Sequence, residues 1–153
     1  MDSIKLYTDG SSLGNPGPAG YGFVLEYKGY RKFGGDMLNT MTNQQAELIA
    51  AINGLNAITD ESIPVEVFSD SEYVVKGANE WLMRWWANGF KTSKGKPVKN
   101  ADLWRELSDT IDAFDQVHFT WVKGHNGNEW NEVADDIAHT SAKLAHERLA
   151  EFA

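Results

Sequence analysis

The chain contains no cysteine among its 153 residues. This absence excludes disulfide frameworks and thiolate metal sites, and it is consistent with a reducing compartment. No apolar run approaches the roughly 20 residues that a transmembrane helix needs. The first residues, Met1-Asp2-Ser3, also lack the charged and then apolar pattern of a secretory signal. We therefore expect a protein with no membrane partner that is cytoplasmic if it is bacterial.

Repeats, low-complexity segments and linkers are also lacking, and only four prolines are present. A chain of this length can bury about two thirds of the surface that it exposes when unfolded, so it needs no covalent staple. We expect residues 1–153 to form a single domain. Nothing in the sequence indicates an obligate oligomer, so a monomer is predicted.

Positive charge is scarce, because 14 Lys and Arg face 22 Asp and Glu for a net charge of -8. This deficit argues against a nucleic-acid partner, since phosphate binding is driven by basic side chains that release counterions. The distribution argues the other way. The segment 81–100 holds five basic residues and no acidic one, namely Arg84, Lys91, Lys94, Lys96 and Lys99. Such a segment can bind phosphate or can be an ordinary solvated surface.

Two short β-type runs end in aspartate. Residues 4–9 alternate in polarity and precede a Gly/Ser/Asn/Pro cluster, which predicts a strand that ends at Asp9. Residues 65–70 repeat this pattern and end at Asp70, before a helix that begins near Ser71. Strands joined through a helix are usually parallel, so both carboxylates should meet at the sheet edge where α/β proteins bind ligands. The alternatives are a turn aspartate at Asp9 and a helix N-cap at Asp70.

Further patterns predict the remaining elements. Strands 21–27 and 30–33 should form a hairpin joined at Lys28-Gly29, and a helix over 43–57 should follow the capping box of Thr42 and Gln45. A further helical stretch should stop at Asn88-Gly89, and Asn100 should cap the next helix. A strand over 117–122 and a helix from Glu129 complete the chain. The last helix should face inward with Val133, Ile137, Ala138, Ser141 and Leu144.

Two further acids lie on these predicted helices. Glu47 is one turn into the helix over 43–57, where a carboxylate is also favoured by the helix dipole alone. Asp135 lies off the inward stripe of the last helix, and the alternative for it is an exposed surface acid. Trp81 and Trp85, four residues apart beside the basic segment, suit either a hydrophobic core or base stacking.

Six motifs together resemble one family. They are Tyr-Thr-Asp-Gly-Ser at 7–11, Gly-Asn-Pro-Gly-Pro at 14–18, Ala-Glu-Leu at 46–48, Ser-Asp-Ser-Glu-Tyr-Val at 69–74, Lys-Pro-Val-Lys-Asn at 96–100, and Trp-Val-Lys-Gly-His at 121–125 with an aspartate ten residues later. In this order they resemble the bacterial type 1 ribonuclease H family from about residue 4 to residue 138. The resemblance implies an α/β ribonuclease H-like fold with a five-stranded mixed sheet, in the order β-β-β-α-β-α-α-β-α, flanked by helices. It also implies endonucleolytic cleavage of the RNA strand of an RNA/DNA hybrid.

The same resemblance implies a metal site and a histidine. The metal-binding acids would be Asp9, Glu47, Asp70 and Asp135, with His125 assisting turnover. Magnesium prefers such oxygen ligands, and manganese is a possible substitute. Two ions about 4 Å apart suit an in-line phosphodiester displacement. An imidazole with a pKa near 6.5 can exchange a proton at neutral pH.

Candidate substrate contacts fall into two groups. Asn15, Asn43 and Gln44 are expected to read the 2′-hydroxyls of RNA, and Trp81, Trp85, Lys91, Lys94, Lys96 and Lys99 to hold the DNA strand, with Thr42 and Asn100 as phosphate contacts. Glu72 stands where the family usually has glutamine, which predicts weaker substrate binding at that position. Two other functions stay open, namely a nuclease of the same fold that cuts DNA and a non-catalytic hybrid-binding module.

Overall fold

The computed structural model describes residues 2–124 and 128–152. The strands are β1 (Ile4–Ser12), β2 (Gly17–Tyr27), β3 (Tyr30–Met41), β4 (Val65–Ser69) and β5 (Val117–Trp121). The helices are α1 (Asn43–Asn56), α2 (Glu72–Lys76), the π-helical segment η1 (Gly77–Trp81), α3 (Leu82–Asn88), α4 (Ala101–Asp112) and α5 (Glu129–Ala150).

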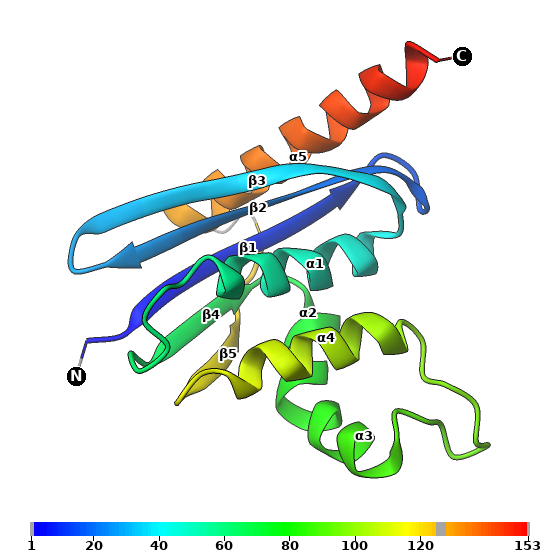
Figure 1. The fold of residues 1–153 in the computed structure, drawn as a ribbon. Coiled ribbons are helices and arrows are strands. Elements are labelled where there is room, and N and C mark those ends of the chain that lie inside the picture. The colour runs from blue at the N-terminus through cyan, green and yellow to red at the C-terminus, as the bar shows by residue number, and fades with distance from the viewer. Residues whose placement is uncertain (1, 125–127, 153) are drawn as a thin grey trace.

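The strands form one five-stranded sheet in the order β3-β2-β1-β4-β5, as Figure 1 shows. β1, β2 and β3 are antiparallel neighbours, whereas β4 pairs parallel to both β1 and β5. The α2, η1 and α3 segments follow one another without a gap and correspond to the single helical stretch expected before Gly89. The predicted α/β fold with a mixed sheet is therefore confirmed.

The hairpin between β2 and β3 turns where the sequence predicted. Lys28 and Gly29 both have positive φ, 50° and 83°, which is the backbone of a tight two-residue hairpin turn. Both strands are longer than predicted, because β2 begins at Gly17 and β3 continues to Met41. Their extra residues include glycines and exposed polar side chains, so they carry little of the alternation from which strands are predicted.

Helices cover both faces of the sheet. β1 alternates between the faces, so Gly10 contacts α1 whereas Asp9, paired with Gly22, lies on the face that α5 covers. A Cβ atom at Gly22 would lie 2.5 Å from the Ala134 carbonyl oxygen of α5, so glycine is required for this close approach. In Figure 1, α1 and α5 accordingly run on opposite sides of β1 and β2.

The inward face of α5 differs in part from the prediction. Its buried side chains are small, with Ala134, Ala138 and Ser141 against the glycine-containing part of β2. Leu144 was predicted to face inward, which is wrong, since it is 48% exposed. The helix approaches the sheet so closely that small residues, not large ones, mark its buried stripe.

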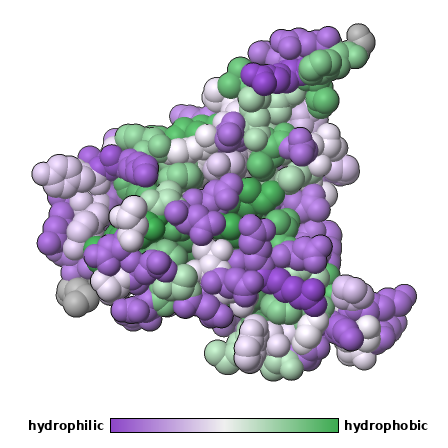
Figure 2. All heavy atoms as spheres, viewed as in Figure 1, coloured by the Kyte–Doolittle hydropathy of each residue, from purple (hydrophilic) through white to green (hydrophobic). Residues whose placement is uncertain are grey.

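The surface is largely polar. In the view of Figure 2, hydrophilic side chains are spread over most of the molecule, and hydrophobic ones lie between them across the middle and at the C-terminal end of the chain, where Leu149 and Phe152 are exposed. Within residues 2–124 and 128–152, no helix is both long and apolar enough to cross a lipid bilayer.

Candidate active site

Asp9 lies inside β1 and not at its end. The prediction of a strand that stops at Asp9 is wrong, because β1 stays paired with β2 as far as Ser12. On its other side, however, the parallel ladder with β4 ends at the pair Thr8 and Ser69. β4 therefore stops one residue before Asp9, and side chains from other elements can reach the Asp9 carboxylate there.

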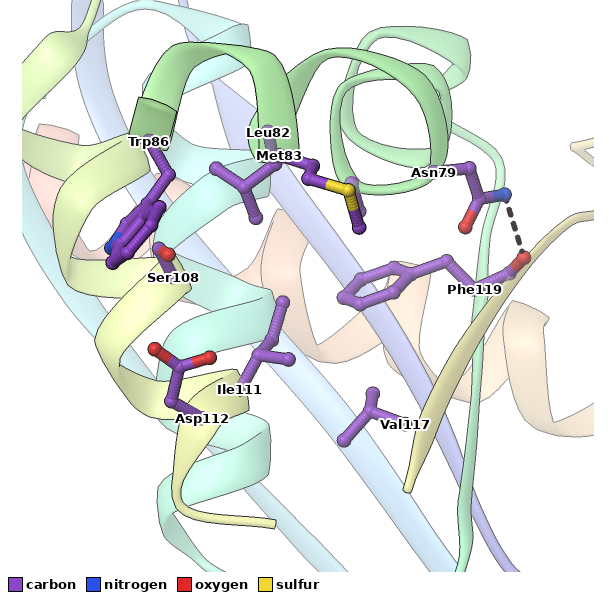
Figure 3. Close-up of a pocket in the computed structure, with 10 residues that line it drawn as sticks. Asn79, Leu82, Met83, Trp86, Ser108, Ile111, Asp112, Val117 and Phe119 are labelled. Atoms are coloured by element: carbon purple, nitrogen blue, oxygen red, sulfur yellow. Dashed lines mark hydrogen bonds between the residues drawn. The ribbon is translucent and has the colours of Figure 1, made fainter. Parts of the chain in front are cut away.

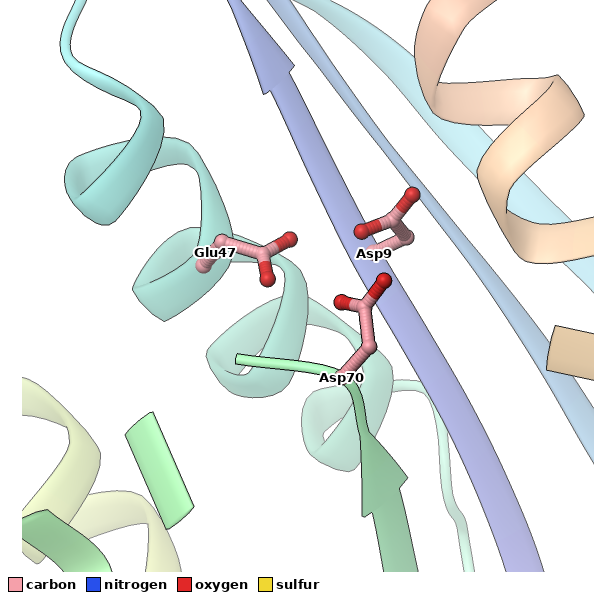
Figure 4. Close-up of side chains that lie close together, drawn as sticks. All are labelled: Asp9, Glu47 and Asp70. Carbon is pink, nitrogen blue, oxygen red and sulfur yellow. The ribbon is translucent and has the colours of Figure 1, made fainter. Parts of the chain in front are cut away.

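Three carboxylates meet at this point. Asp9, Glu47 and Asp70 each present an oxygen such that all three oxygens lie within 4.8 Å of one another. Figure 4 shows the three side chains pointing toward one another from β1, from α1 and from the end of β4. Asp9 is 6% exposed and Glu47 9%, whereas Asp70 is half-buried. The structure thus brings together three of the four acids that the sequence singled out.

Glu47 is held by the backbone of β1. The Gly10 N–H donates a hydrogen bond to Glu47 Oε1. A Cβ atom at residue 10 would lie 2.3 Å from the Ala46 carbonyl carbon, so glycine lets β1 approach α1 closely enough for this bond. The start of α1 is capped instead by the predicted capping box, in which Thr42 and Gln45 bond each other's backbone N–H. Glu47 is therefore not needed as a cap.

Asp70 is likewise free of a capping role. The N-cap of α2 is Ser71, whose hydroxyl accepts a hydrogen bond from the Val74 N–H at 3.2 Å. The alternative interpretation of Asp70 as an N-cap is wrong. Ser71 fills that role because its short hydroxyl reaches the free N–H groups of the first turn, which leaves the Asp70 carboxylate to face Asp9 and Glu47.

Asp135 borders the same pocket from α5, which covers the face of the sheet opposite α1. It lies on α5 and is half-buried, so it is not the fully exposed acid of the alternative interpretation. Asp9, Glu47, Asp70 and Asp135 all line one pocket of about 340 Å³, together with the start of α1 and Ser71. Four elements that are far apart in the chain thus each contribute one acid.

Crowding changes the acidity of these groups. Burial, and then the charge of Glu47, raise the pKa of Asp9. Burial also raises the pKa of Glu47, and burial together with the charge of Asp135 raises that of Asp70. A bound divalent cation would offset this repulsion, and a set of carboxylate oxygens suits a hard cation such as Mg²⁺ or Mn²⁺. The donor set therefore fits a divalent metal cofactor.

Amide side chains border the acidic pocket at the start of α1. The Asn43 N–H donates to Asn15 Oδ1 at 2.9 Å, and Asn43 Oδ1 accepts from the Ser12 N–H at 3.0 Å. These bonds join the loop after β1 to α1. Gln44 lines the pocket itself, and its Oε1 atom is buried with no hydrogen-bond partner in the described part of the chain.

The Gln45 side chain links Thr42 and Asn100, although the sequence alone assigned Gln45 no functional role. Gln45 Nε2 donates to Asn100 Oδ1 at 3.3 Å, while the same side chain completes the capping box with Thr42. Asn100 also donates to the Tyr73 hydroxyl at 3.1 Å, and Trp104 Nε1 donates to that hydroxyl at 2.8 Å. Asn100 occupies the N-cap position of α4, but its side chain forms no capping bond because these partners engage it.

Trp81 and Trp85 belong to an aromatic cluster. Their ring centroids are 5.5 Å apart, and Trp85 lies 5.3 Å from the fully buried Trp104. Both are partly buried, so the core interpretation holds for part of each ring. Each residue also keeps some exposed surface within the basic segment 81–100.

The basic loop, residues 89–99, is anchored at both ends. Phe90 and Val98 are buried, and the Val98 N–H donates to the Phe90 carbonyl at 2.9 Å. In Figure 1 this loop projects at the lower right, between α3 and α4. Its lysines are all exposed, namely Lys91, Lys94, Lys96 and Lys99. Glu72 is also exposed, in the first turn of α2, and His125 lies outside the described residues.

Comparison with known proteins decides the family. The family model of RNase H matches residues 1–143. The chain belongs to the ribonuclease H family. A ribonuclease H of Pseudomonas putida (strain W619) is 47% identical over 140 residues, which is 90% of this chain and 92% of that one. One of Marinobacter nauticus is 47% identical over 147 residues, with 92% and 94% covered.

Solved structures agree with this ribonuclease H assignment. LC9-RNase H1, a type 1 RNase H with the type 2 active-site motif, superposes with a TM-score of 0.83 at 26% identity, covering 95% of this chain and 74% of that one. RNase H1 of the archaeon Halobacterium salinarum gives a TM-score of 0.69 at 31% identity, with 92% and 98% covered. The predicted family and fold are confirmed.

A separate apolar pocket of about 370 Å³ lies between η1, α3, α4 and β5. Figure 3 shows Leu82, Met83, Ile111 and Phe119 directed into it. Its lining includes none of the site residues predicted for this ribonuclease H. Among the described residues, this pocket is therefore distinct from the acidic pocket.

Proposed function

We propose that this ribonuclease H cleaves the RNA strand of RNA/DNA hybrids internally, with Mg²⁺ held by Asp9, Glu47, Asp70 and Asp135. The observation that carries this proposal is the convergence of three carboxylate oxygens within 4.8 Å beside a fourth acid of the same pocket. The curated relatives bear the name ribonuclease H. A foamy viral protease-reverse transcriptase, solved in complex with an RNA/DNA hybrid, is similar at 26% identity with a TM-score of 0.78, over 92% of this chain and 20% of that one.

The acids prepare the reaction by their placement. When bound, two divalent ions supply an activated water and stabilise the leaving oxygen of an in-line displacement. Glu47 keeps one oxygen on the Gly10 N–H, which fixes the orientation of the carboxylate before substrate arrives. Asp9 is held in the middle of a paired strand, and its burial keeps bulk water away. His125 is proposed to pass a proton to or from the reacting oxygens at neutral pH.

Substrate selection is divided between two surfaces. Asn15, Asn43 and Gln44, which lie at the start of α1 and in the loop bonded to it, are proposed to contact the 2′-hydroxyls of the RNA strand. Trp81, Trp85 and the exposed lysines of the basic loop are proposed to hold the DNA strand, with Thr42 and Asn100 as phosphate contacts. Glu72 is proposed to weaken this contact, since a carboxylate repels phosphate.

Cleavage of an end-labelled hybrid tests the function. With Mg²⁺, the enzyme should cut only the RNA strand and at internal positions, and EDTA should abolish cutting. Duplex DNA and duplex RNA of the same sequence serve as matched controls. Cutting of duplex DNA would instead indicate a DNA nuclease of the same fold, and binding without cutting in Mg²⁺ or Mn²⁺ would indicate a non-catalytic module. A single domain, a monomeric state and a cytoplasmic location remain predictions.

A further inference from the structure

The end of β5 contacts the backbone around Asp70. β4 ends at Ser69 and α2 begins at Glu72, so the Asp70 peptide lies just beyond the β-ladder. The last pair of that ladder is Ser69 and Trp121, and the Val122 N–H donates to the Ser69 carbonyl at 2.9 Å. Trp121 Nε1 donates to the Asp70 carbonyl oxygen at 3.1 Å. An indole N–H thus continues the hydrogen bonding of the ladder by one residue.

Gly124 lies next to the side chain of Asp70. A Cβ atom at Gly124 would lie 2.8 Å from Asp70 Oδ2 and 3.6 Å from Asp70 Cβ. The nearest atom is thus the end of a side chain and not the backbone. A methyl group at this position would therefore move the Asp70 carboxylate without disturbing the sheet.

We propose that Trp121 and Gly124 are positioning residues for Asp70, the first by fixing its peptide and the second by leaving room for its carboxylate. The inference rests on the proposed function, in which Asp70 is a metal ligand. Trp121 is 45% exposed, so its ring contributes less to the core than a buried tryptophan does. Its indole N–H is the part that reaches Asp70, and it donates to the backbone carbonyl oxygen of that residue. Asp70 alone of the three clustered acids lies beyond the end of a strand, and so it needs this external support.

The test compares Trp121→Phe with the wild-type enzyme. Phenylalanine keeps an aromatic ring but lacks the indole N–H, so it removes the hydrogen bond to Asp70 together with part of the ring. Mg²⁺ affinity is measured by calorimetry on the protein alone, and kcat, KM for a hybrid and Tm are measured in parallel. We expect the Kd for Mg²⁺ to rise about tenfold and kcat to fall, with KM and Tm unchanged.

Two further variants separate positioning from other effects. Gly124→Ala should give the same loss of Mg²⁺ affinity at unchanged Tm, because it displaces the carboxylate directly. Trp86→Phe, at a tryptophan of α3 that is 67% exposed, should keep wild-type values and controls for the loss of an indole. Wild-type Mg²⁺ affinity in both Trp121→Phe and Gly124→Ala overturns the inference alone, even if their activity falls. A wild-type enzyme that neither binds Mg²⁺ nor cuts the hybrid overturns the proposed function as well.

Discussion

The acidic pocket and the basic loop are built in opposite ways. The acids are drawn from β1, α1, the end of β4 and α5, and the two most buried are less than one tenth exposed. The lysines are neighbours in one loop and are all exposed, and the loop is anchored through the buried side chains of Phe90 and Val98. The first arrangement fixes atoms for chemistry, whereas the second provides charge that tolerates variation. A single substitution in the pocket should therefore abolish most of the activity, whereas substitutions on the loop should weaken hybrid binding step by step.

The largest effect is expected from removing one charge in the pocket. Asp9→Asn and Asp70→Asn should each lower kcat about 1000-fold or more, because an amide is a poor replacement for a carboxylate ligand. Hybrid binding should persist, since the loop is untouched. Cleavage rates and filter binding on the same samples measure both. Asp60→Asn, at a loop acid outside the pocket, is the control, and a comparable loss there would erase the distinction between the regions.

Stability without metal should depend on pH because of Asp9. Burial and the charge of Glu47 raise the pKa of Asp9, so its contribution to stability is present below about pH 4 and is lost as the pH rises through the folded-state pKa. In EDTA, Tm should therefore fall by about 5 °C toward pH 8. The Tm of Asp9→Asn should fall less over the same pH range. Addition of Mg²⁺ to the wild-type protein should restore the Tm that it loses in EDTA. Equal dependence of Tm on pH in the wild type and in Asp9→Asn would show that ionisation of Asp9 does not destabilise the metal-free protein.

Charge reversal on the loop should weaken binding by degrees. Changing Lys91, Lys94 and Lys96 to glutamate should raise the Kd for hybrid about 10- to 100-fold and reduce the slope of log K against log salt by about 2 to 3. The kcat at saturation should change little. The matched control reverses three exposed lysines elsewhere, Lys5, Lys28 and Lys32. If both triple variants bind alike, net charge and not the loop determines affinity.

A smaller effect is expected where the two regions are joined. Tyr73→Phe removes the hydroxyl that accepts from Asn100 and from buried Trp104. An unsatisfied indole N–H should lower the free energy of unfolding by about 1–3 kcal/mol. Release of Asn100 should raise KM severalfold without changing kcat. Urea denaturation and steady-state kinetics give the two values, and a fall in kcat with KM unchanged would place Tyr73 with the catalytic pocket instead.

The smallest effect is expected at Glu72. Glu72→Gln should tighten hybrid binding about two- to threefold, because it removes an exposed charge that repels phosphate. It should also lower stability slightly, since the carboxylate lies in the first turn of α2. Fluorescence anisotropy with a labelled hybrid measures the change. Glu80→Gln, at an exposed acid of η1, controls for the loss of one negative charge, and equal effects would remove any specific role of Glu72.

Local signals made much of the fold predictable. The turn at Lys28-Gly29, the capping box of Thr42 and Gln45, and the helix stop at Gly89 each depend on residues close in sequence, and all three are confirmed. The gathering of acids at one place followed from the parallel pairing of β1 and β4, although Asp9 proved to lie inside its strand. The continuation of β1 beyond Asp9 depends on its pairing with the antiparallel strand β2.

Features set by distant contacts could not be predicted from single residues. The extra length of β2 and the small buried stripe of α5 meet at Gly20 and Ser141, a contact that no local pattern reveals. Gln45 was recognised as part of a cap, but its second partner, Asn100, is 55 positions away. Ser71 and Asp70 are both good capping residues in adjacent positions, so the sequence alone did not decide that Ser71 is the cap of α2.

Titration of the wild-type protein with Mg²⁺, followed by amide NMR shifts, tests most directly the claim that acids from four elements form one metal site. The account predicts that the amides of Asp9, Gly10, Glu47 and Asp70 shift together with one Kd, because Gly10 is bonded to Glu47 and the three acids are adjacent. The same titration of Asp70→Asn should lose these shifts. Shifts confined to other acidic surfaces, or unchanged shifts in Asp70→Asn, would contradict it.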